Sequence, residues 1–431
     1  MSTFGSKRRA VIVGGMRTPF AKAFTELKEL DTIALGAAAT SALLRKLELP
    51  HKEIEAVVWG GVVLPPLSVN IGREIVLDLG LPTSIEAMTV TRACASGLQA
   101  ITTAAAAIER GDADVIIAGG SDSTSNAPIT FPTKVTRTLA PLALSGKATP
   151  QDILGALAQL VPLSEVLPRQ PRVAERTTGE VMGESAERMA QRNEISRQAQ
   201  DELSLRSHQR AARAIATGVF DDEVAKIETP NGYVHVDTLV RADTSLDKLS
   251  RLKPVFAKAG TITAGNATAL TDGAAAVVLM SEEKARALGY TPLAALRSWS
   301  YVAVDPADQL LIGPAIAVPK ALAKAGLELS DIDVIDMHEA FAAQVLSVLK
   351  MLDSQAFAEE RLGRSKPVGA VDIDKMNIYG GSIAIGHPFA ATGARMATTM
   401  AYELQRSNKS TALLGICAAG GLGAAAVLER V

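Results

Sequence analysis

The sequence predicts a layered α/β protein, and three observations support this fold class. Short apolar runs end in glycine or small polar residues, which suits strands that are buried on both faces of a sheet. Helical patterns alternate with these runs. The two outer parts of the chain also echo each other weakly, since each has an apolar strand that runs into small residues: VIIAGGSDS at 115–123 and LLGICAAGGLGA at 413–424. The echo indicates a duplicated α/β unit.

Strands and helices can be placed in order along the chain. The helix over 95–111 ends at Gly111, which is a plausible C-terminal cap because glycine adopts the left-handed conformation at little cost. The predicted helices are LDTIALGAAATSALLRKL at 30–47 and ASGLQAITTAAAAIERG at 95–111. The predicted strands lie in AVIVGGMRTPF at 10–20, AVVWGGVV at 56–63, DVIIAGGSDS at 114–123, AAAVVLMS at 274–281, DVIDMHEAF at 333–341 and ALLGICAAGGLGAAAVLE at 412–429.

The middle of the chain has a different character. From about Ala127 to Gly260 the charge rises, prolines cluster and helical patterns dominate. The segment 197–218 is amphipathic, with leucines and alanines at helical spacing. We interpret this part as an insertion carried on an α/β core.

Composition excludes several classes of function. The chain of 431 residues has a net charge of -2, with 48% hydrophobic and 21% charged residues, so no broad electrostatic case for nucleic acid exists. Two cysteines cannot build a disulfide framework and favour a reduced, intracellular setting. No signal-like stretch opens the sequence, and no uncharged apolar run reaches the roughly 20 residues that span a bilayer. The cytoplasm is the expected location.

Cys94 stands in VTRACASGLQAI, which predicts a strand, a tight turn of small residues and then a helix. The unpaired N–H groups and the dipole of a helix N-terminus favour a thiolate, and the small neighbours leave room for a substrate carbon. The alternative is a buried cysteine that acts as a small hydrophobic residue. Cys94 is therefore a candidate nucleophile.

Two of the five histidines lie in contexts that favour function. His338, in DMHEAFAAQ, comes where a strand ends and a helix begins, and His387 lies between a glycine-rich turn and a proline that can start a helix. Such strand ends are where α/β proteins build their sites. The other histidines have ordinary interpretations: His51 and His235 at the surface, and His208 on an amphipathic helix facing solvent or a neighbouring helix.

Cys417 leaves an apolar strand into a run of small residues, where glycines let backbone N–H groups approach a ligand. A tight turn between two strands is the structural alternative. The two cysteines are hundreds of residues apart and lack C-x-x-C partners, so we predict no metal site, and no G-x-G-x-x-G dinucleotide fingerprint follows the first strand. Two thiols and two imidazoles instead suit covalent catalysis on an acyl group, with one thiol as nucleophile and the other moving a proton at carbon.

Four motifs, in this order, resemble the thiolase superfamily: RACASG at Cys94, HEAFA at His338, GGSIAIGHPFAATGAR at His387 and CAAGGLGAAAVLE at Cys417. The resemblance covers nearly the whole chain. It implies a five-layered αβαβα fold made of two similar α/β halves with an inserted, mainly helical loop domain. The implied domains are an N-terminal half at 1–127 completed by 261–286, the inserted domain at 128–260 and a C-terminal half at 287–431. Members work as homodimers or homotetramers.

The resemblance also implies roles for the site residues. Cys94 is acylated and His387 activates it, while Cys417 protonates the leaving enolate in the degradative direction. His338 occupies a position that is asparagine in many thiolases, where the side chain holds a water in the first oxyanion hole. The second hole uses the backbone N–H of the nucleophile and that of Ala419, which is glycine in many relatives.

Coenzyme A is the implied co-substrate, with no permanently bound cofactor. For its binding the resemblance points to Met182 in VMGESAE, Arg241 in LVRADTSLDKL and Thr268 in AGNATALTDG. An arginine suits phosphate or adenine contact, whereas a solvated loop charge is the alternative for Arg241.

Within the superfamily, the chain looks closest to the thiolase subunits of fatty-acid oxidation multienzyme complexes, both the bacterial anaerobic-type subunit and the mitochondrial trifunctional β subunit. This implies cleavage of 3-ketoacyl-CoA in lipid degradation, often beside a hydratase–dehydrogenase α subunit. Residues 140–172 leave two interpretations open: a helix that covers an acyl tunnel or packs on the core, or contact with a partner subunit or membrane surface. Its apolar residues at helical spacing are Ile153, Leu154, Leu157, Leu160 and Val161.

Three other functions remain as alternatives. A biosynthetic acetoacetyl-CoA thiolase differs only through the HEAF variant and the long insertion. A decarboxylating 3-ketoacyl synthase shares Cys with two His, but decarboxylation creates the carbanion without a proton-abstracting thiol, so Cys417 argues against it. An inactive scaffold on the same fold predicts loss of a catalytic group.

Overall fold

The computed structural model describes residues 8–168 and 174–431. The chain divides into two compact units: residues 1–126 with 174–431 form the larger one, and residues 127–173 form the smaller one. The insertion expected at 128–260 therefore contributes to both, since its residues from 174 onward cluster with the α/β core. The predicted domain boundaries stay a prediction.

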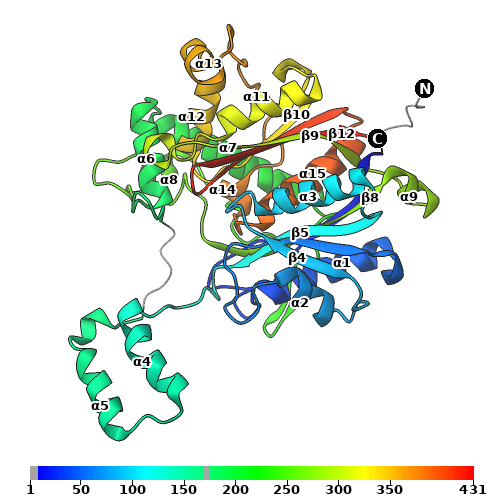
Figure 1. Ribbon diagram of the computed structural model, residues 1–431. Helices are drawn as coiled ribbons and strands as arrows, with labels where there is room; N and C mark the ends of the chain where they lie inside the picture. The colour runs from blue at the N-terminus through cyan, green and yellow to red at the C-terminus, as the bar shows by residue number, and fades with distance from the viewer. Residues whose placement is uncertain (1–7, 169–173) are drawn as a thin grey trace. The chain divides into compact units, whose positions relative to one another are not determined.

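A single ten-stranded sheet runs through the larger unit (Figure 1). Its strands follow the order β10-β11-β12-β9-β1-β8-β5-β3-β4, and β2 pairs with β8 beside this path. A separate hairpin is formed by β6 (Ile227–Thr229) and β7 (Gly232–Val234). The strands of the large sheet are β1 (Ala10–Arg17), β2 (Ala21–Lys22), β3 (Ala56–Gly60), β4 (Glu86–Val90), β5 (Val115–Ser123), β8 (Thr271–Ser281), β9 (Ala294–Ala303), β10 (Val334–Met337), β11 (Thr411–Ala418) and β12 (Leu422–Arg430).

The predicted duplication is visible in the strand order. In the N-terminal half β3 pairs in parallel with β5, β5 pairs antiparallel with β8, and β8 pairs antiparallel with β1. In the C-terminal half β10, β11, β12 and β9 repeat the same directions in the same order. The halves join where β1 and β9 pair antiparallel over Val11–Ala295 and Ile12–Ala294. Two similar α/β halves are thus confirmed.

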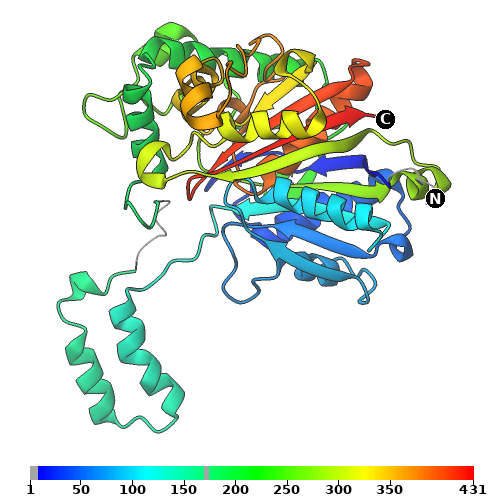
Figure 2. The same ribbon diagram turned by 45° about the horizontal axis from the view of Figure 1, so that its top comes forward.

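Helices cover the two halves of the sheet in layers (Figures 1 and 2). In the middle α3 (Ser96–Arg110) packs against α15 (Ala391–Arg406), and both touch strands of the sheet. On the outer faces α1 (Thr32–Leu47) and α2 (Ile71–Asp78) cover the N-terminal strands, while α11 (Pro314–Ala325) covers the C-terminal strands and contacts α12 (Ala342–Leu352). Three apolar clusters fill the spaces, one central and one under each outer layer. The expected five-layered fold is confirmed.

Local sequence signals explain the helix ends. The Asp31 side chain accepts the Ala34 N–H at the start of α1, which satisfies a backbone donor that the helix leaves unpaired. Gly111 ends α3 with φ +85°, in the left-handed conformation expected for it. The remaining short elements are α9 (Glu282–Ala287), α10 (Pro306–Gln309), α13 (Gln355–Leu362), α14 (Ser382–Ile385), η1 (His51–Glu53) and η3 (Leu329–Asp331).

The part of the insertion that belongs to the larger unit is mainly helical. It contains α6 (Met182–Arg192), the amphipathic α7 (Arg197–Ala216) and the short α8 (Leu246–Ser250). Helices α6 and α7 both pack against α12, and α7 also packs against α14. The insertion therefore reaches the segments that carry His338 and His387.

The smaller unit holds α4 (Thr133–Ser145), α5 (Pro150–Gln159) and η2 (Leu163–Glu165). Thr149 and Asp152 cap α5 reciprocally, as a capping box. The sequence pattern placed Leu160 and Val161 on this helix, but α5 ends at Gln159. The apolar residues at helical spacing therefore continue beyond the end of the helix. Among residues 8–168 and 174–431, none of the helices has the length and apolar character needed to cross a bilayer.

Candidate active site

Cys94 lies in the turn between β4 and α3, as the sequence predicts. Ala93 has φ +45°, a left-handed conformation that costs energy for a residue with a side chain. Ser96 stabilises this turn, because its Oγ accepts the Arg92 N–H at 2.8 Å and donates to the Ala93 carbonyl at 2.6 Å. The strained turn presents the sulfur next to the first turn of α3.

The turn packs directly against the segment after His387. A Cβ on Gly97 would come within 2.2 Å of the Ala390 carbonyl oxygen, so only glycine permits this approach. Asp122, at the end of β5, accepts the Ala390 N–H at 2.7 Å and the Val62 N–H at 2.9 Å. Burial raises the pKa of Asp122 to about 7. These contacts hold the nucleophile turn against the His387 segment.

The protonation state of Cys94 corrects one expectation. The helix N-terminus was expected to favour a thiolate, but burial raises the pKa of the thiol to about 12, with the Asp122 carboxylate adding to the rise. The N–H groups of Ala419 and of Cys94 itself hydrogen-bond the sulfur and only partly offset the effect of burial. Cys94 therefore rests as a thiol and needs a base.

We expect the ultraviolet absorbance of wild type minus that of Cys94→Ala to show no thiolate step between about pH 5 and 9. The sign follows from the raised pKa, because a thiol with a higher pKa stays protonated until the pH rises toward that value. A step near neutral pH would instead reveal a thiolate–imidazolium pair at rest.

His387 follows the short helix α14 through Gly386, whose φ of +112° lies in the region that favours glycine. The backbone N–H of His387 donates to Thr271 Oγ1 at 3.0 Å, and its Nδ1 hydrogen-bonds the Thr392 hydroxyl at 2.6 Å. Burial, together with the positive charge of Arg395, lowers the pKa of the imidazole to about 3. The ring is thus neutral at physiological pH and can accept a proton.

Thr392→Val is expected to lower kcat by about 10- to 100-fold with little loss of stability, because the imidazole loses the hydrogen bond that orients it. The matched control is Thr398→Val on the same helix, where the buried hydroxyl has no hydrogen-bond partner among the described residues. Steady-state rates and melting temperatures of the two variants check this. Equal rates in both would show that Thr392 does not orient the ring.

His338 extends strand β10, since its N–H donates to the Gly415 carbonyl at 2.8 Å. Its Nδ1 hydrogen-bonds the Ser382 hydroxyl at 2.9 Å. Burial lowers the pKa of this imidazole well below its usual range, and the neighbouring His387 and Arg395 lower it further. His338 is therefore a second neutral imidazole.

The fold brings three of the candidate residues to one point. The Cys94 sulfur and one ring nitrogen from each of His338 and His387 all lie within 4.8 Å of one another. The two imidazole rings are 4.1 Å apart between centroids and tilted by 47°. Within the described part of the chain, Nε2 of His338 and Nε2 of His387 have no hydrogen-bond partner although both are buried. These nitrogens are free to bind a substrate oxygen or move a proton.

Cys417 completes the group from β11. It is buried, and the pKa of its thiol is raised by burial and further by the nearby Cys94 sulfur. The turn that follows contains Gly420 and Gly421, with φ of +81° and +68°. Glu175 Oε2 accepts the Gly420 N–H at 2.9 Å. This contact anchors the turn whose Ala419 N–H points at the Cys94 sulfur.

Glu339, next to His338 in the sequence, has a structural role. Its buried carboxylate accepts hydrogen bonds from the Ser207 hydroxyl at 2.7 Å, from Asn377 Nδ2 at 2.6 Å and from the Ile383 N–H at 3.2 Å. It thereby ties α7 and the start of α14 to the end of β10. Because α14 also carries Ser382, these bonds fix the partner of the His338 ring.

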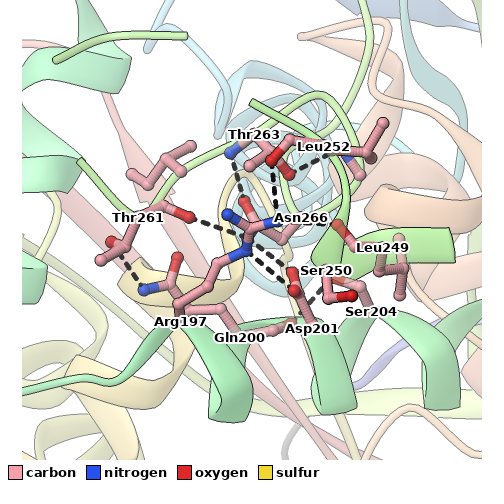
Figure 3. A network of polar contacts seen from close by, with 12 residues as sticks. Arg197, Gln200, Asp201, Ser204, Leu249, Ser250, Leu252, Thr261, Thr263 and Asn266 are labelled. Atoms are coloured by element: carbon pink, nitrogen blue, oxygen red, sulfur yellow. Dashed lines mark hydrogen bonds and ion pairs between the residues drawn. The ribbon is translucent and has the colours of Figure 1, made fainter. Parts of the chain in front are cut away.

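Thr268 also contacts Ser382, the hydrogen-bond partner of the His338 ring. Its hydroxyl donates to the Ser382 carbonyl at 2.7 Å, and its N–H donates to the Ala340 carbonyl at 3.0 Å. The segment before it is held by a polar network in which Asn266 Nδ2 donates to Asp201 Oδ1 at 2.9 Å and Arg197 pairs with Asp201 (Figure 3). The structure thus places the half-buried Thr268 beside Ser382, the residue that supports the His338 ring.

The other predicted coenzyme A residues are placed as follows. Met182 begins α6 and packs, half-buried, on the apolar cluster that includes Cys417. Arg241 is exposed, and its backbone N–H donates to His208 Nδ1 at 3.2 Å. His208 is only 2% exposed, so its side chain faces the protein interior and not solvent. Coenzyme A binding by Met182, Arg241 and Thr268 remains a prediction.

Several residues that support the catalytic side chains were not predicted from the sequence. Ser382, Thr392 and Arg395 all lie in the motif around His387, and hydroxyls and a guanidinium at helical offsets from a histidine were the available signal. The Arg395 guanidinium forms a buried ion pair with Asp336. Asp122 and Glu175 carried no signal, because only the fold shows which backbone N–H groups their carboxylates receive.

Comparison with known proteins agrees with this geometry. The model of the thiolase N-terminal domain matches residues 10–283, and that of the thiolase C-terminal domain matches residues 290–430. A 3-ketoacyl-CoA thiolase of Pseudoalteromonas translucida (strain TAC 125) is 46% identical over 424 residues, covering 98% of this chain and 97% of the relative.

Solved structures are similar over nearly the whole chain. The acetyl-CoA acetyltransferase of Bacillus anthracis has a TM-score of 0.84 at 32% identity, covering 99% of this chain and 100% of that one. Human mitochondrial 3-ketoacyl-CoA thiolase in complex with CoA has a TM-score of 0.84 at 30% identity, covering 98% of both chains.

Proposed function

The chain belongs to the thiolase family, and from that premise we propose how it cleaves 3-ketoacyl-CoA with coenzyme A to give acetyl-CoA and a shortened acyl-CoA. It is an acyltransferase, and coenzyme A is its co-substrate. One observation carries the proposal: a thiol and two neutral imidazoles converge within 4.8 Å, with a second thiol beside them.

In the first half-reaction the Cys94 sulfur attacks the 3-keto carbon and its proton passes to His387. The N–H groups of Cys94 and Ala419, which already point at the sulfur, stabilise the negative oxygen that forms. The bond between the 2- and 3-carbons then breaks, its electron pair moves to the acetyl-CoA enolate, and the Cys417 thiol protonates the 2-carbon. The acyl group remains on Cys94 as a thioester.

Between the half-reactions the proton that His387 took from Cys94 passes to the Cys417 thiolate, so both groups return to their neutral forms. In the second half-reaction the thiol of coenzyme A attacks this thioester and gives its proton to His387, which passes it to the departing Cys94 sulfur, so Cys94 leaves as the thiol. During cleavage the enolate oxygen needs a separate donor site. The unpartnered Nε2 atoms of His387 and His338 supply it, either directly or, for His338, through a water. At this stage His387 carries the proton taken from Cys94 and can donate it from Nε2, while the neutral His338 ring can donate from Nε2 when its Nδ1 accepts the Ser382 hydroxyl.

The chain length of the substrate is tested by cleavage rates over 3-ketoacyl-CoAs from about C4 to C16. We expect kcat/KM for medium and long chains to exceed that for acetoacetyl-CoA by about 10-fold or more, since each buried methylene group contributes about 0.8 kcal/mol. A preference for acetoacetyl-CoA would instead support a biosynthetic thiolase, which the similarity to the Bacillus anthracis acetyl-CoA acetyltransferase makes the second candidate.

We propose further that the chain forms a homodimer or homotetramer, works in the cytoplasm and associates with a hydratase–dehydrogenase α subunit. The edge strand β4, on which Met88 is 44% exposed, supports an oligomer, as do the exposed apolar side chains of Leu67 and Val69. The two free cysteines suit a reducing compartment. Light scattering of the purified chain, cell fractionation and affinity purification from the native source test these three points separately.

A further inference from the structure

We propose that Cys94, His338 and His387 form a binding site for a soft divalent cation such as Zn²⁺, which inhibits the enzyme by occupying the position of the substrate carbonyl. This goes beyond the proposed reaction, which uses no metal. The cation is a reversible inhibitor here and has no part in turnover. The proposal depends on the positions of ligand atoms and not on the catalytic roles assigned to them.

The ligand set is of the kind that Zn²⁺ prefers. One thiolate sulfur and two imidazole nitrogens are nitrogen and sulfur ligands, and three protein ligands with an open position are typical of reactive zinc sites. With Zn–S near about 2.3 Å and Zn–N near about 2.0 Å, ligand atoms in a tetrahedron lie about 3.5 Å apart. The three atoms here lie within 4.8 Å of one another. Side-chain rotations that move these ligand atoms by about 1 Å would therefore bring them to the distances of a zinc site.

The surroundings of the imidazoles also match those of metal ligands. A ligating histidine usually hydrogen-bonds through its other ring nitrogen, which fixes the ring. Nδ1 of His338 is held by Ser382 and Nδ1 of His387 by Thr392, which leaves Nε2 of each ring buried and without a hydrogen-bond partner among the described residues. These are two independent observations that point to a ligand between the rings.

Some charges near the site favour a bound dication and others disfavour it. The Asp122 carboxylate lies close enough to Cys94 to influence its thiol, and its negative charge favours a dication. Arg395 opposes it, but its guanidinium is paired with Asp336. Metal binding requires Cys94 to lose its proton. The sequence spacing did not indicate this site, because His338 lies 244 residues after Cys94 and His387 a further 49 residues on, in three separate motifs.

Cobalt(II) provides a direct probe, since tetrahedral Co²⁺ with a thiolate ligand absorbs strongly in the visible and shows a sulfur-to-metal charge-transfer band. We expect one Co²⁺ per chain in the wild type and in the control His235→Asn, whose histidine is exposed. His338→Asn should weaken binding by at least about 100-fold, because loss of supporting partners alone costs 10- to 100-fold. Cys94→Ser should lose the charge-transfer band.

A second measurement needs no variant. Zn²⁺ should slow the alkylation of Cys94 by iodoacetamide, as followed by peptide mass spectrometry, and a chelator should restore the rate. The proposal is wrong if His338→Asn and His235→Asn bind Co²⁺ equally, if the bound cobalt has the weak spectrum of a six-coordinate oxygen site, or if Zn²⁺ leaves alkylation unchanged. None of these readouts requires turnover, so they stand apart from a failure of the proposed reaction.

Discussion

Cys94→Ala is expected to lower kcat by about 10⁴-fold or more, because every acyl group that the enzyme transfers passes through this sulfur. Its partner base, His387, is neutral, and the Cys94 sulfur is the thiol that converges with it. The measurement is the steady-state cleavage of a 3-ketoacyl-CoA by the purified variant.

Stability separates this loss from misfolding. Cys94 packs beside the central apolar cluster, and removing one sulfur there should change the melting temperature by only a few degrees. The affinity for coenzyme A should stay within about 3-fold, since the alanine keeps the backbone N–H groups of the turn in place. Turnover within 10-fold of wild type in a folded variant would be incompatible with an acyl-cysteine intermediate.

Cys417→Ala is expected to lower the cleavage rate by about 10²- to 10⁴-fold while leaving acyl transfer to Cys94 intact. The physical reason is a division of labour: Cys417 moves a proton at the 2-carbon, whereas Cys94 and His387 exchange the acyl group. The buried, protonated Cys417 thiol suits an acid that gives a proton to an enolate.

Two assays distinguish the roles of the thiols. Acylation of Cys94 by acyl-CoA should proceed in Cys417→Ala at close to the wild-type rate, measured by mass spectrometry. Exchange of the acetyl-CoA methyl protons with deuterated solvent, measured by nuclear magnetic resonance, should stop. Persistent exchange in this variant would assign the proton transfer to another group, and the first to test would be His338.

The sequence was sufficient for the fold class because buried strands and amphipathic helices leave periodic patterns. The echo between 115–123 and 413–424 proved structural, since β5 and β11 hold equivalent places in the two halves of the sheet. The extent of the inserted unit was predicted less accurately from the sequence. Only residues 127–173 form their own unit, because later helices of the insertion pack against α12 and α14, contacts that no local pattern encodes.

At the site, the chemistry-bearing residues were predictable but their environment was not. Cys94, His338, His387 and Cys417 stood out as rare residue types next to strand ends and glycine-rich turns. The resting state of Cys94 depends on desolvation, which outweighs the hydrogen bonds that the sulfur receives from the N–H groups of Ala419 and Cys94. Likewise the supports from Ser382 and Glu175 depend on contacts between segments far apart in the chain, whereas Thr392 lies only five residues after the histidine it orients.

The central claim is that the acyl group of the substrate resides on Cys94 between the two half-reactions. Mixing the enzyme with a 3-ketoacyl-CoA in the absence of free coenzyme A, quenching in acid and mapping peptides by mass spectrometry tests it directly. We expect the shortened acyl group on the peptide containing Cys94, and its discharge when coenzyme A is added before the quench. An acyl group on Cys417, or no adduct while acetyl-CoA is released, would contradict the account.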